Sequence, residues 1–155
     1  MDGSLEVLEA LNNVYHCLTS LESQAHLQEH ALEADGWGSS KYWDYVETKV
    51  HTKCTHKILD RMFALGGNPT FESGYEVKYF RDDFSSAIAT TIESLSICQD
   101  SIQLAIAAAE QDGDCVTECI LYKCMKFVEK QICVFEGLAK RFGALGPMAM
   151  TGDVG

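Results

Sequence analysis

The scarcity of proline is the feature that most constrains the fold of this chain. Only Pro69 and Pro147 are present among 155 residues, and neither interrupts a stretch of helical periodicity. Because proline inside a helix costs about 3 kcal/mol, long helices are compatible with the sequence on both sides of Pro69. Apolar residues recur at spacings of three and four in four long segments, which is the period of one buried helix face. The sequence therefore predicts an all-α protein.

The connections between these segments predict how the helices are arranged. The first and last are short turns rich in glycine and aspartate, whereas the middle one is long and aromatic. This order is typical of an up-down-down-up four-helix bundle with a long crossover between helices two and three. We expect Asp114 to cap the fourth helix. The predicted helices are at about 4–33, 40–65, 82–111 and 115–142, in a bundle domain 1–146 followed by a short flexible tail 147–155.

The first helix is predicted to carry an apolar face and a solvated polar face. The apolar face begins at Leu5, and the polar face is expected to include Gln28 and Glu29. We also place His16, His26 and His30 on the polar face. His26 and His30 are one turn apart, so they can take up divalent metal adventitiously.

Charge and cysteine content restrict the partners and the compartment. The chain holds 23 acidic and 12 basic residues, for a net charge of -11. This balance argues against nucleic acid and anionic membranes as partners and permits cationic ones. No apolar run approaches the roughly 20 residues of a membrane span, and no basic-aromatic patch is visible in the sequence. Seven cysteines without an N-terminal apolar segment favour a reducing, cytoplasmic location.

Residues spread over nearly the whole chain place it close to one known family. They are Met1, Gly3, Val7, Leu11, Asn12, Gly36, Glu47, Lys53, Arg61, Leu65, Gly67 and Pro69, and then, with a few residues of offset, Ala105, Ile106, Ala107, Leu138, Leu145 and Gly146. In this pattern the chain resembles the bacterioferritins. The resemblance implies a ferritin-like bundle that pairs about a two-fold axis. In the family such pairs assemble into a hollow cage that stores iron.

The residues at the family's di-iron positions differ from the family pattern. A carboxylate-bridged di-iron centre takes one Glu from each of two helices and a Glu-x-x-His pair from each of the other two. None of the four carboxylates is present here, so no catalytic residue and no ferroxidase centre are expected. The six family ligand positions hold Leu18, His51, Cys54, Ile97, Val128 and Gln131.

The family's haem site is altered as well. Bacterioferritins hold haem with a methionine from each of two subunits, and that position is Thr52 here. His56 lies one turn later on the same face, where it could supply bis-imidazole ligation in a shifted site. The alternative is that His56 is an exposed or interface histidine. Bound haem is not expected.

Two sets of residues are candidates for binding soft metals. Glu47, His51 and Cys54 are spaced i, i+4 and i+7 on helix two, and Gln131 approaches from helix four in the family arrangement. Oxygen, nitrogen and sulfur on one face suit zinc or another soft metal. Alternatively, Cys54 is a packing residue and His51 a hydrogen-bonded one.

Helix four carries the second set, Cys115, Cys119, Cys124 and Cys133. Cys115 and Cys119 are one turn apart, a spacing at which two thiolates can share a copper(I) ion or oxidise together. The alternative is that these are ordinary packing cysteines.

These observations lead to two functional hypotheses. The first is a bacterioferritin-like subunit for iron storage or homeostasis that is silent at the di-iron site and acts as a structural cage component. Its partners would be further copies, in a two-fold dimer or a 24-subunit cage, or an active bacterioferritin subunit. The second is a protein that binds zinc or copper, or undergoes thiol redox chemistry, through His51, Cys54 and the helix-four cysteines. An enzyme with a rebuilt site ranks third. The sequence leaves the cofactor unknown; iron stored as mineral fits the first hypothesis, and zinc or copper fits the second.

The segment 146–152 bears on the cage. In the family a short fifth helix lines the four-fold pore at this point. Proline and glycine in this segment argue against such a helix. The sequence therefore leaves the size of the assembly open.

Overall fold

A computed structural model of the chain describes residues 4–145, and these residues form helices and connections without a strand. The predicted all-α class is confirmed. The predicted tail 147–155 and the segment 146–152 lie outside the described residues. The helical elements are α1 (Leu5–Ala34), α2 (Ser40–Val50), a π-helical turn (His51–Thr55), α3 (His56–Ala64), α4 (Phe84–Asp112) and α5 (Cys115–Leu145).

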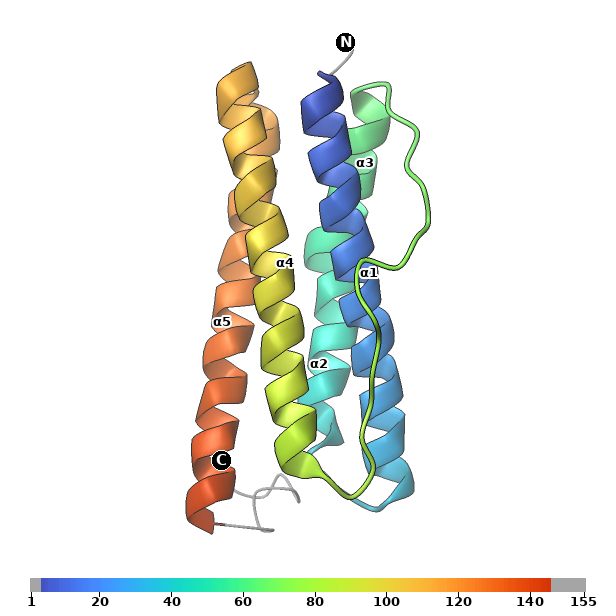
Figure 1. The fold of residues 1–155 in the computed structure, drawn as a ribbon, viewed down its shortest axis with the longest axis vertical. Coiled ribbons are helices and arrows are strands. Elements are labelled where there is room, and N and C mark those ends of the chain that lie inside the picture. The colour runs from blue at the N-terminus through green and yellow to red at the C-terminus, as the bar shows by residue number, and fades with distance from the viewer. Residues whose placement is uncertain (1–3, 146–155) are drawn as a thin grey trace.

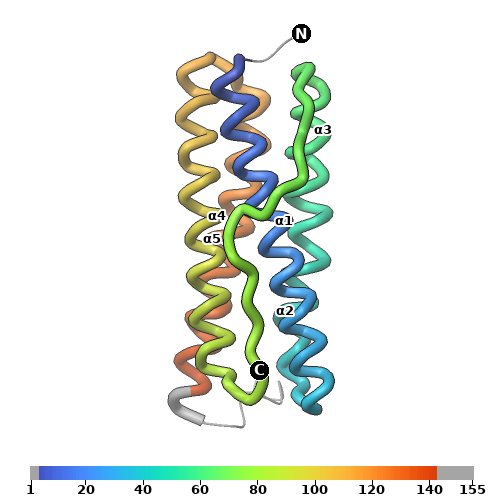
Figure 2. Tube along the Cα trace, turned by 45° about the vertical axis from the view of Figure 1, so that its right-hand side comes forward, coloured from blue at the N-terminus to red at the C-terminus, as the bar shows by residue number. Residues whose placement is uncertain are grey.

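The helices form one up-down-down-up bundle (Figure 1). α1 is antiparallel to the continuous helical segment made of α2, the π turn and α3. Residues 65–83 then return along the full length of the bundle as an extended crossover, which Figure 2 shows lying across the front of the helices. α4 consequently runs parallel to α2 and α3, and α5 runs back beside α4. The predicted topology and the long crossover are confirmed.

Side-chain caps fix where three helices begin. The hydroxyl of Ser4 accepts the backbone N–H of Val7 at 3.1 Å, and the carboxylate of Asp83 accepts that of Ser86 at 3.0 Å. Asp114 accepts the N–H of Thr117 at 3.0 Å, as predicted for the start of the fourth helix. Each cap satisfies a backbone donor that has no partner within its helix.

The second predicted helix contains a π turn that the sequence analysis did not anticipate. Its buried stripe advances in steps of four residues from Val46 through Val50, Cys54 and Ile58 to Met62. An α-helix has 3.6 residues per turn, so repeated steps of four drift away from the core face. The wider π turn at His51–Thr55 absorbs this drift, and all five side chains stay buried.

A cluster of aromatic rings closes one end of the core. Trp43 is fully buried, with its ring centroid 5.9 Å from that of Phe84 and 5.0 Å from that of Phe135. Its indole N–H donates to the hydroxyl of Thr91 at 2.8 Å, so the only polar atom of the side chain is satisfied.

At the other end of the bundle the predicted apolar face of the first helix is wrong by one residue. Leu5 was expected on that face, but it is 84% exposed in the first turn of α1.

A ladder of polar side chains on α1 holds the crossover in place. Five residues at four-residue intervals hydrogen-bond to the crossover, and several bonds involve its backbone. The prediction that His16 and Gln28 lie on a solvated face is wrong, because the crossover covers both and buries them. The ladder consists of Asn12 and His16 with Thr70, Ser20 with Gly74, Gln24 with Lys78, and Gln28 with Phe80.

Gly74 marks the closest approach of the crossover to α1. Its N–H donates to the hydroxyl of Ser20 at 2.9 Å. A Cβ atom at this position would lie 2.6 Å from the backbone nitrogen of Cys17. Only glycine therefore allows the two backbones to lie this close.

The two hydrogen bonds between Gln28 and Phe80 allow the contribution of the ladder to stability to be measured. Its amide donates to the carbonyl of Phe80 at 2.8 Å and accepts the N–H of Phe80 at 2.9 Å. Gln28→Ala leaves both backbone groups without this partner, so we expect a loss of about 1 to 3 kcal/mol in the free energy of unfolding. Chemical denaturation followed by circular dichroism measures it. Gln103→Ala, an exposed position on α4, is the matched control, and equal losses in both variants would contradict a structural role for the ladder.

One largely buried ion pair joins α3 to the start of α5. The guanidinium of Arg61 donates to the carboxylate of Asp114 at 2.9 Å and to the hydroxyl of Thr117 at 3.0 Å. Burial raises the pKa of Asp114, but the hydrogen bonds from Thr117 and the charge of Arg61 outweigh it and hold the pKa below its usual range.

The lowered pKa of Asp114 predicts a specific dependence of stability on pH. The ionised carboxylate stabilises the fold above its unfolded-state pKa of about 3.9, and this contribution is lost as the pH falls through the lower folded-state value. We expect Asp114→Asn to cost about 1 kcal/mol at pH 7 and the difference from wild type to shrink below about pH 4. Denaturation at a series of pH values measures this. Asp100→Asn, at an exposed position, is the control, and a difference for Asp114→Asn that persists at pH 2 would contradict the assignment.

Candidate metal sites

The six residues that the resemblance assigned to the di-iron positions lie in two different environments. Leu18, Cys54 and Val128 are fully buried, and Gln131 is 2% exposed. Ile97 is half-buried, whereas His51 lies at the surface with 61% of its side chain exposed. The interior positions thus offer one thiol and one amide as polar groups. These side chains do not fit a di-iron centre, which requires carboxylate and imidazole ligands.

The four residues predicted to share a soft metal face different ways. Glu47 contacts His26 of α1, and Nδ1 of His51 lies 3.2 Å from a carboxylate oxygen of Glu22. Cys54 and Gln131 instead point into the core. The predicted spacing assumed an undisturbed α-helix, and the π turn that begins at His51 changes the register between Glu47 and Cys54. The structure does not bring the four side chains around one point.

Four cysteines lie in the core, one on each long helical segment. The Sγ of Cys98 donates to the carbonyl of Cys17 at 3.4 Å, and the thiols of Cys54 and Cys124 hydrogen-bond to each other. Burial raises the pKa of Cys17 and of Cys98, and the bond to Cys124 together with burial raises the pKa of Cys54. The thiols of Cys17, Cys54 and Cys98 are therefore kept neutral, a state that is poor at both metal binding and nucleophilic attack. The hydrogen bond from Cys54 instead lowers the pKa of Cys124.

The helix-four cysteines do not form one group. Cys124 is buried, whereas Cys115, Cys119 and Cys133 are exposed. The Sγ of Cys115 lies 3.8 Å from the carbonyl of Gly113. The packing alternative thus fits Cys124, and the exposed cysteines remain accessible to solvent.

The residues of the haem hypothesis border two neighbouring hollows between α1 and α2–α3. Thr52 lines a groove of about 710 Å³, which His51 also borders. His56 lines the adjacent hollow of about 190 Å³, and its Nε2 lies 3.4 Å from a carboxylate oxygen of Asp60. The side chain of His56 is 65% exposed. Haem ligation by His56 stays a prediction, and the geometry agrees with the alternative of an exposed histidine.

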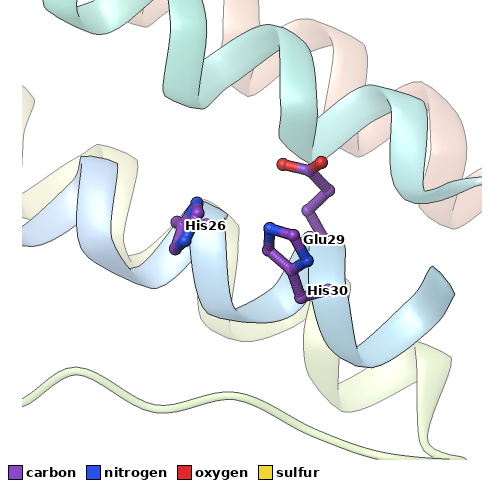
Figure 3. A group of neighbouring side chains, drawn as sticks. All are labelled: His26, Glu29 and His30. Carbon is purple, nitrogen blue, oxygen red and sulfur yellow. The ribbon is translucent and has the colours of Figure 1, made fainter. Parts of the chain in front are cut away.

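A cluster of carboxylates and imidazoles lies beside the larger groove, between α1 and α2. Two triads of potential ligand atoms, each with all atoms within 4.8 Å of one another, share Glu29. Figure 3 shows the α1 triad, with the carboxylate of Glu29 reaching across to α2. The side chains of His26 and Glu47 also contact each other. We call this the Glu29 cluster, and it comprises His26, Glu29 and His30 on α1 with Asp44 and Glu47 on α2.

Glu29 is the unusual member of this cluster. The prediction that it is solvated is wrong, because it is only 8% exposed and its Oε2 has no hydrogen-bond partner among the described residues. Burial, followed by the hydrogen bond to Glu47 and the negative charge of Asp44, raises its pKa to about 7. Such a carboxylate is stabilised by either a proton or a cation.

Sequence reasoning named Glu47 and, separately, the pair His26 and His30 as metal-binding residues, but it did not join them to Glu29 and Asp44 in one cluster. The signal was present in the spacing His26-x-x-Glu29-His30, which places three ligands on one helix face, and in Asp44-x-x-Glu47. What the sequence lacked was the relative register of α1 and α2. That register decides whether the two sets meet.

Comparison with known proteins supports the fold. No protein-family model matches the chain, and no curated protein matches it. A solved structure of bacterioferritin from Rhodobacter capsulatus, described as having a metal-free dinuclear site and haem iron, is similar with a TM-score of 0.86. The two sequences are 18% identical, and the match covers 97% of this chain and 94% of that one. This structural similarity shows that the chain has the ferritin-like four-helix fold that its resemblance to bacterioferritins implied.

None of the helices within residues 4–145 combines the length and the apolar character of a membrane-spanning segment.

Proposed function

We propose that this chain is a ferritin-like subunit for iron storage or homeostasis that does not oxidise iron inside its own bundle. The fold supports the ferritin-like part of the proposal. The observation that supports the silent part is the complete burial of Leu18, Cys54 and Val128, none of which carries a carboxylate and all of which the resemblance assigned to di-iron positions. Its role would then be structural, in a cage of identical subunits or beside an active bacterioferritin subunit.

The energetics of the interior are consistent with a metal-independent bundle. A buried carboxylate without a metal or a partner is costly, because its charge loses hydration. Leucine and valine at positions 18 and 128 avoid this cost and add buried apolar surface. The bundle is therefore expected to fold equally well with and without iron.

Assembly and iron oxidation together test this proposal. We expect protein purified without an affinity tag to form a large oligomer that contains iron. We also expect ferrous iron added in air to oxidise no faster than in protein-free buffer during the first turnover, because the carboxylate ligands are absent. Light scattering with metal analysis measures the first quantity, and stopped-flow absorbance of ferric species measures the second.

Each part of the proposal has its own contradicting result. A small oligomer without iron would exclude storage. A fast, saturable oxidation phase with a fixed number of iron ions per chain, retained in the Glu29→Gln variant that disables the Glu29 cluster, would exclude a silent interior. The Leu18→Ala variant serves as a control for packing, because it opens a cavity without adding a ligand.

We further propose that divalent metal binds at the Glu29 cluster. His26 and His30 supply imidazole nitrogens, and Glu29 with Glu47 supplies carboxylate oxygens. This mixture suits a divalent first-row ion such as zinc, ferrous iron or manganese. A cation at this point would also neutralise the crowded carboxylates of Glu29, Asp44 and Glu47.

Replacement of Glu29 separates this site from a surface histidine pair. Glu29→Gln keeps the shape of the side chain and removes its charge, so we expect zinc affinity to fall about tenfold or more. Calorimetric titration of the metal-free protein with zinc measures the affinity. Wild-type affinity in Glu29→Gln would mean that His26 and His30 alone take up the metal. The control His56→Ala removes an exposed histidine outside the cluster and should leave the affinity unchanged.

The soft-metal alternative stays a prediction with less support. The hydrogen bond between Cys54 and Cys124 places two thiols side by side. Burial and the raised pKa of Cys54 nevertheless favour a neutral Cys54 thiol that packs in the core, and Cys124 is fully buried beside it.

A further inference from the structure

Lysines gather on one side of this acidic protein. A groove of about 390 Å³ between α5 and the segment from α2 to α3 is lined by five of the twelve basic residues of the chain. We call it the lysine groove. Its lysines are Lys53, Lys57, Lys123, Lys126 and Lys130.

The five lysines of the groove form no ion pairs with carboxylates of the described residues. All five are exposed, and none is within ion-pair distance of a carboxylate in the part of the chain that the structure describes. Placing several like charges around one small groove raises the electrostatic energy of the folded chain. A chain with a net charge of -11 has many acidic residues that could have been placed beside these lysines. Their absence from the lining concentrates positive potential in the groove.

Two aromatic rings add an apolar surface between the lysines. The rings of Tyr45 and Phe127 are stacked at 26°, with centroids 6.5 Å apart. Phe127 is 7% exposed and Tyr45 is 41% exposed, so Tyr45 leaves part of its surface open to a ligand. The Nζ of Lys53 lies 6.0 Å from the centroid of Phe127. This contact places one ammonium group beside the apolar surface.

We infer that the lysine groove binds a small anion that carries several phosphate groups. Five ammonium groups match the spread charge of a phosphate chain, and the volume lies within the usual range for small-molecule sites. Two sources share this chemistry, an inorganic polyphosphate and a nucleoside triphosphate whose base would stack on Tyr45. The acidic remainder of the surface does not prevent binding, because charges more than about 10 Å away are largely screened at 0.1 M salt.

Titration with two probes tests the inference. Calorimetry of the chelator-treated protein with sodium tripolyphosphate should show saturable binding of one anion per chain, weakened by added salt. The variant Lys123→Gln/Lys126→Gln should bind at least about tenfold more weakly, because two of the five charges are lost. The chelator removes divalent ions, so this result does not depend on metal bound at the Glu29 cluster.

A second lysine pair controls for the general loss of charge. The variant Lys78→Gln/Lys140→Gln loses the same two positive charges as Lys123→Gln/Lys126→Gln. Lys78 is exposed on the crossover and Lys140 is exposed further along α5, so this variant should bind tripolyphosphate as tightly as wild type does. ATP without magnesium distinguishes the two sources. Tighter binding of ATP than of tripolyphosphate, lost in Tyr45→Ala, identifies a nucleotide, whereas equal binding identifies the phosphate chain alone. Absence of saturable binding to either probe, or equal weakening in both lysine pairs, would overturn the inference.

Discussion

The topology depends on the hydrogen bonds that α1 provides to the crossover. Residues 65–83 span the bundle without a helix or a sheet to satisfy their backbone groups. Most of these residues are exposed to water, but the backbone groups that lie against α1 need donors and acceptors from that helix. The polar residues of α1 supply them at intervals of four residues, from Asn12 to Gln28. These bonds hold the crossover against α1 from Asn12 to Gln28. The crossover thus ends at the opposite end of the bundle from where it started, and α4, which begins there, runs parallel to α2 and α3.

The π turn has a comparable influence on the chemistry of the second helical segment. It keeps the stripe from Val46 to Met62 in the core, although that stripe advances too quickly for an α-helix. In the same turn His51 is left at the surface, while Cys54 enters the core. Two residues that sequence spacing placed on one face are thereby separated. The packing of the core thus decides which side chains can act together.

The sequence predicted the features that depend on local pattern. The four helices, the crossover and the cap at Asp114 all follow from periodicity and loop composition, and the structure confirms them. It did not predict features that require two helices to be placed side by side. The burial of Gln28 depends on the crossover, and the burial of Glu29 depends on how α2 packs against α1. The lysine groove was missed for the same reason, because Lys53 and Lys126 are far apart in the sequence and meet only when α5 packs beside the π turn.

An apolar interior changes where polar chemistry can occur in this fold. A ferritin-like bundle with carboxylates inside can place metal between its four helices, whereas in the described part of this chain ionisable side chains gather in grooves between neighbouring helices. Two such grooves have opposite charge. The groove between α1 and α2 gathers carboxylates and imidazoles around Glu29, and the groove toward α5 gathers lysines around Phe127. The net charge of -11 averages over both, which is why composition alone indicated cationic partners and concealed the anion-binding character of one face.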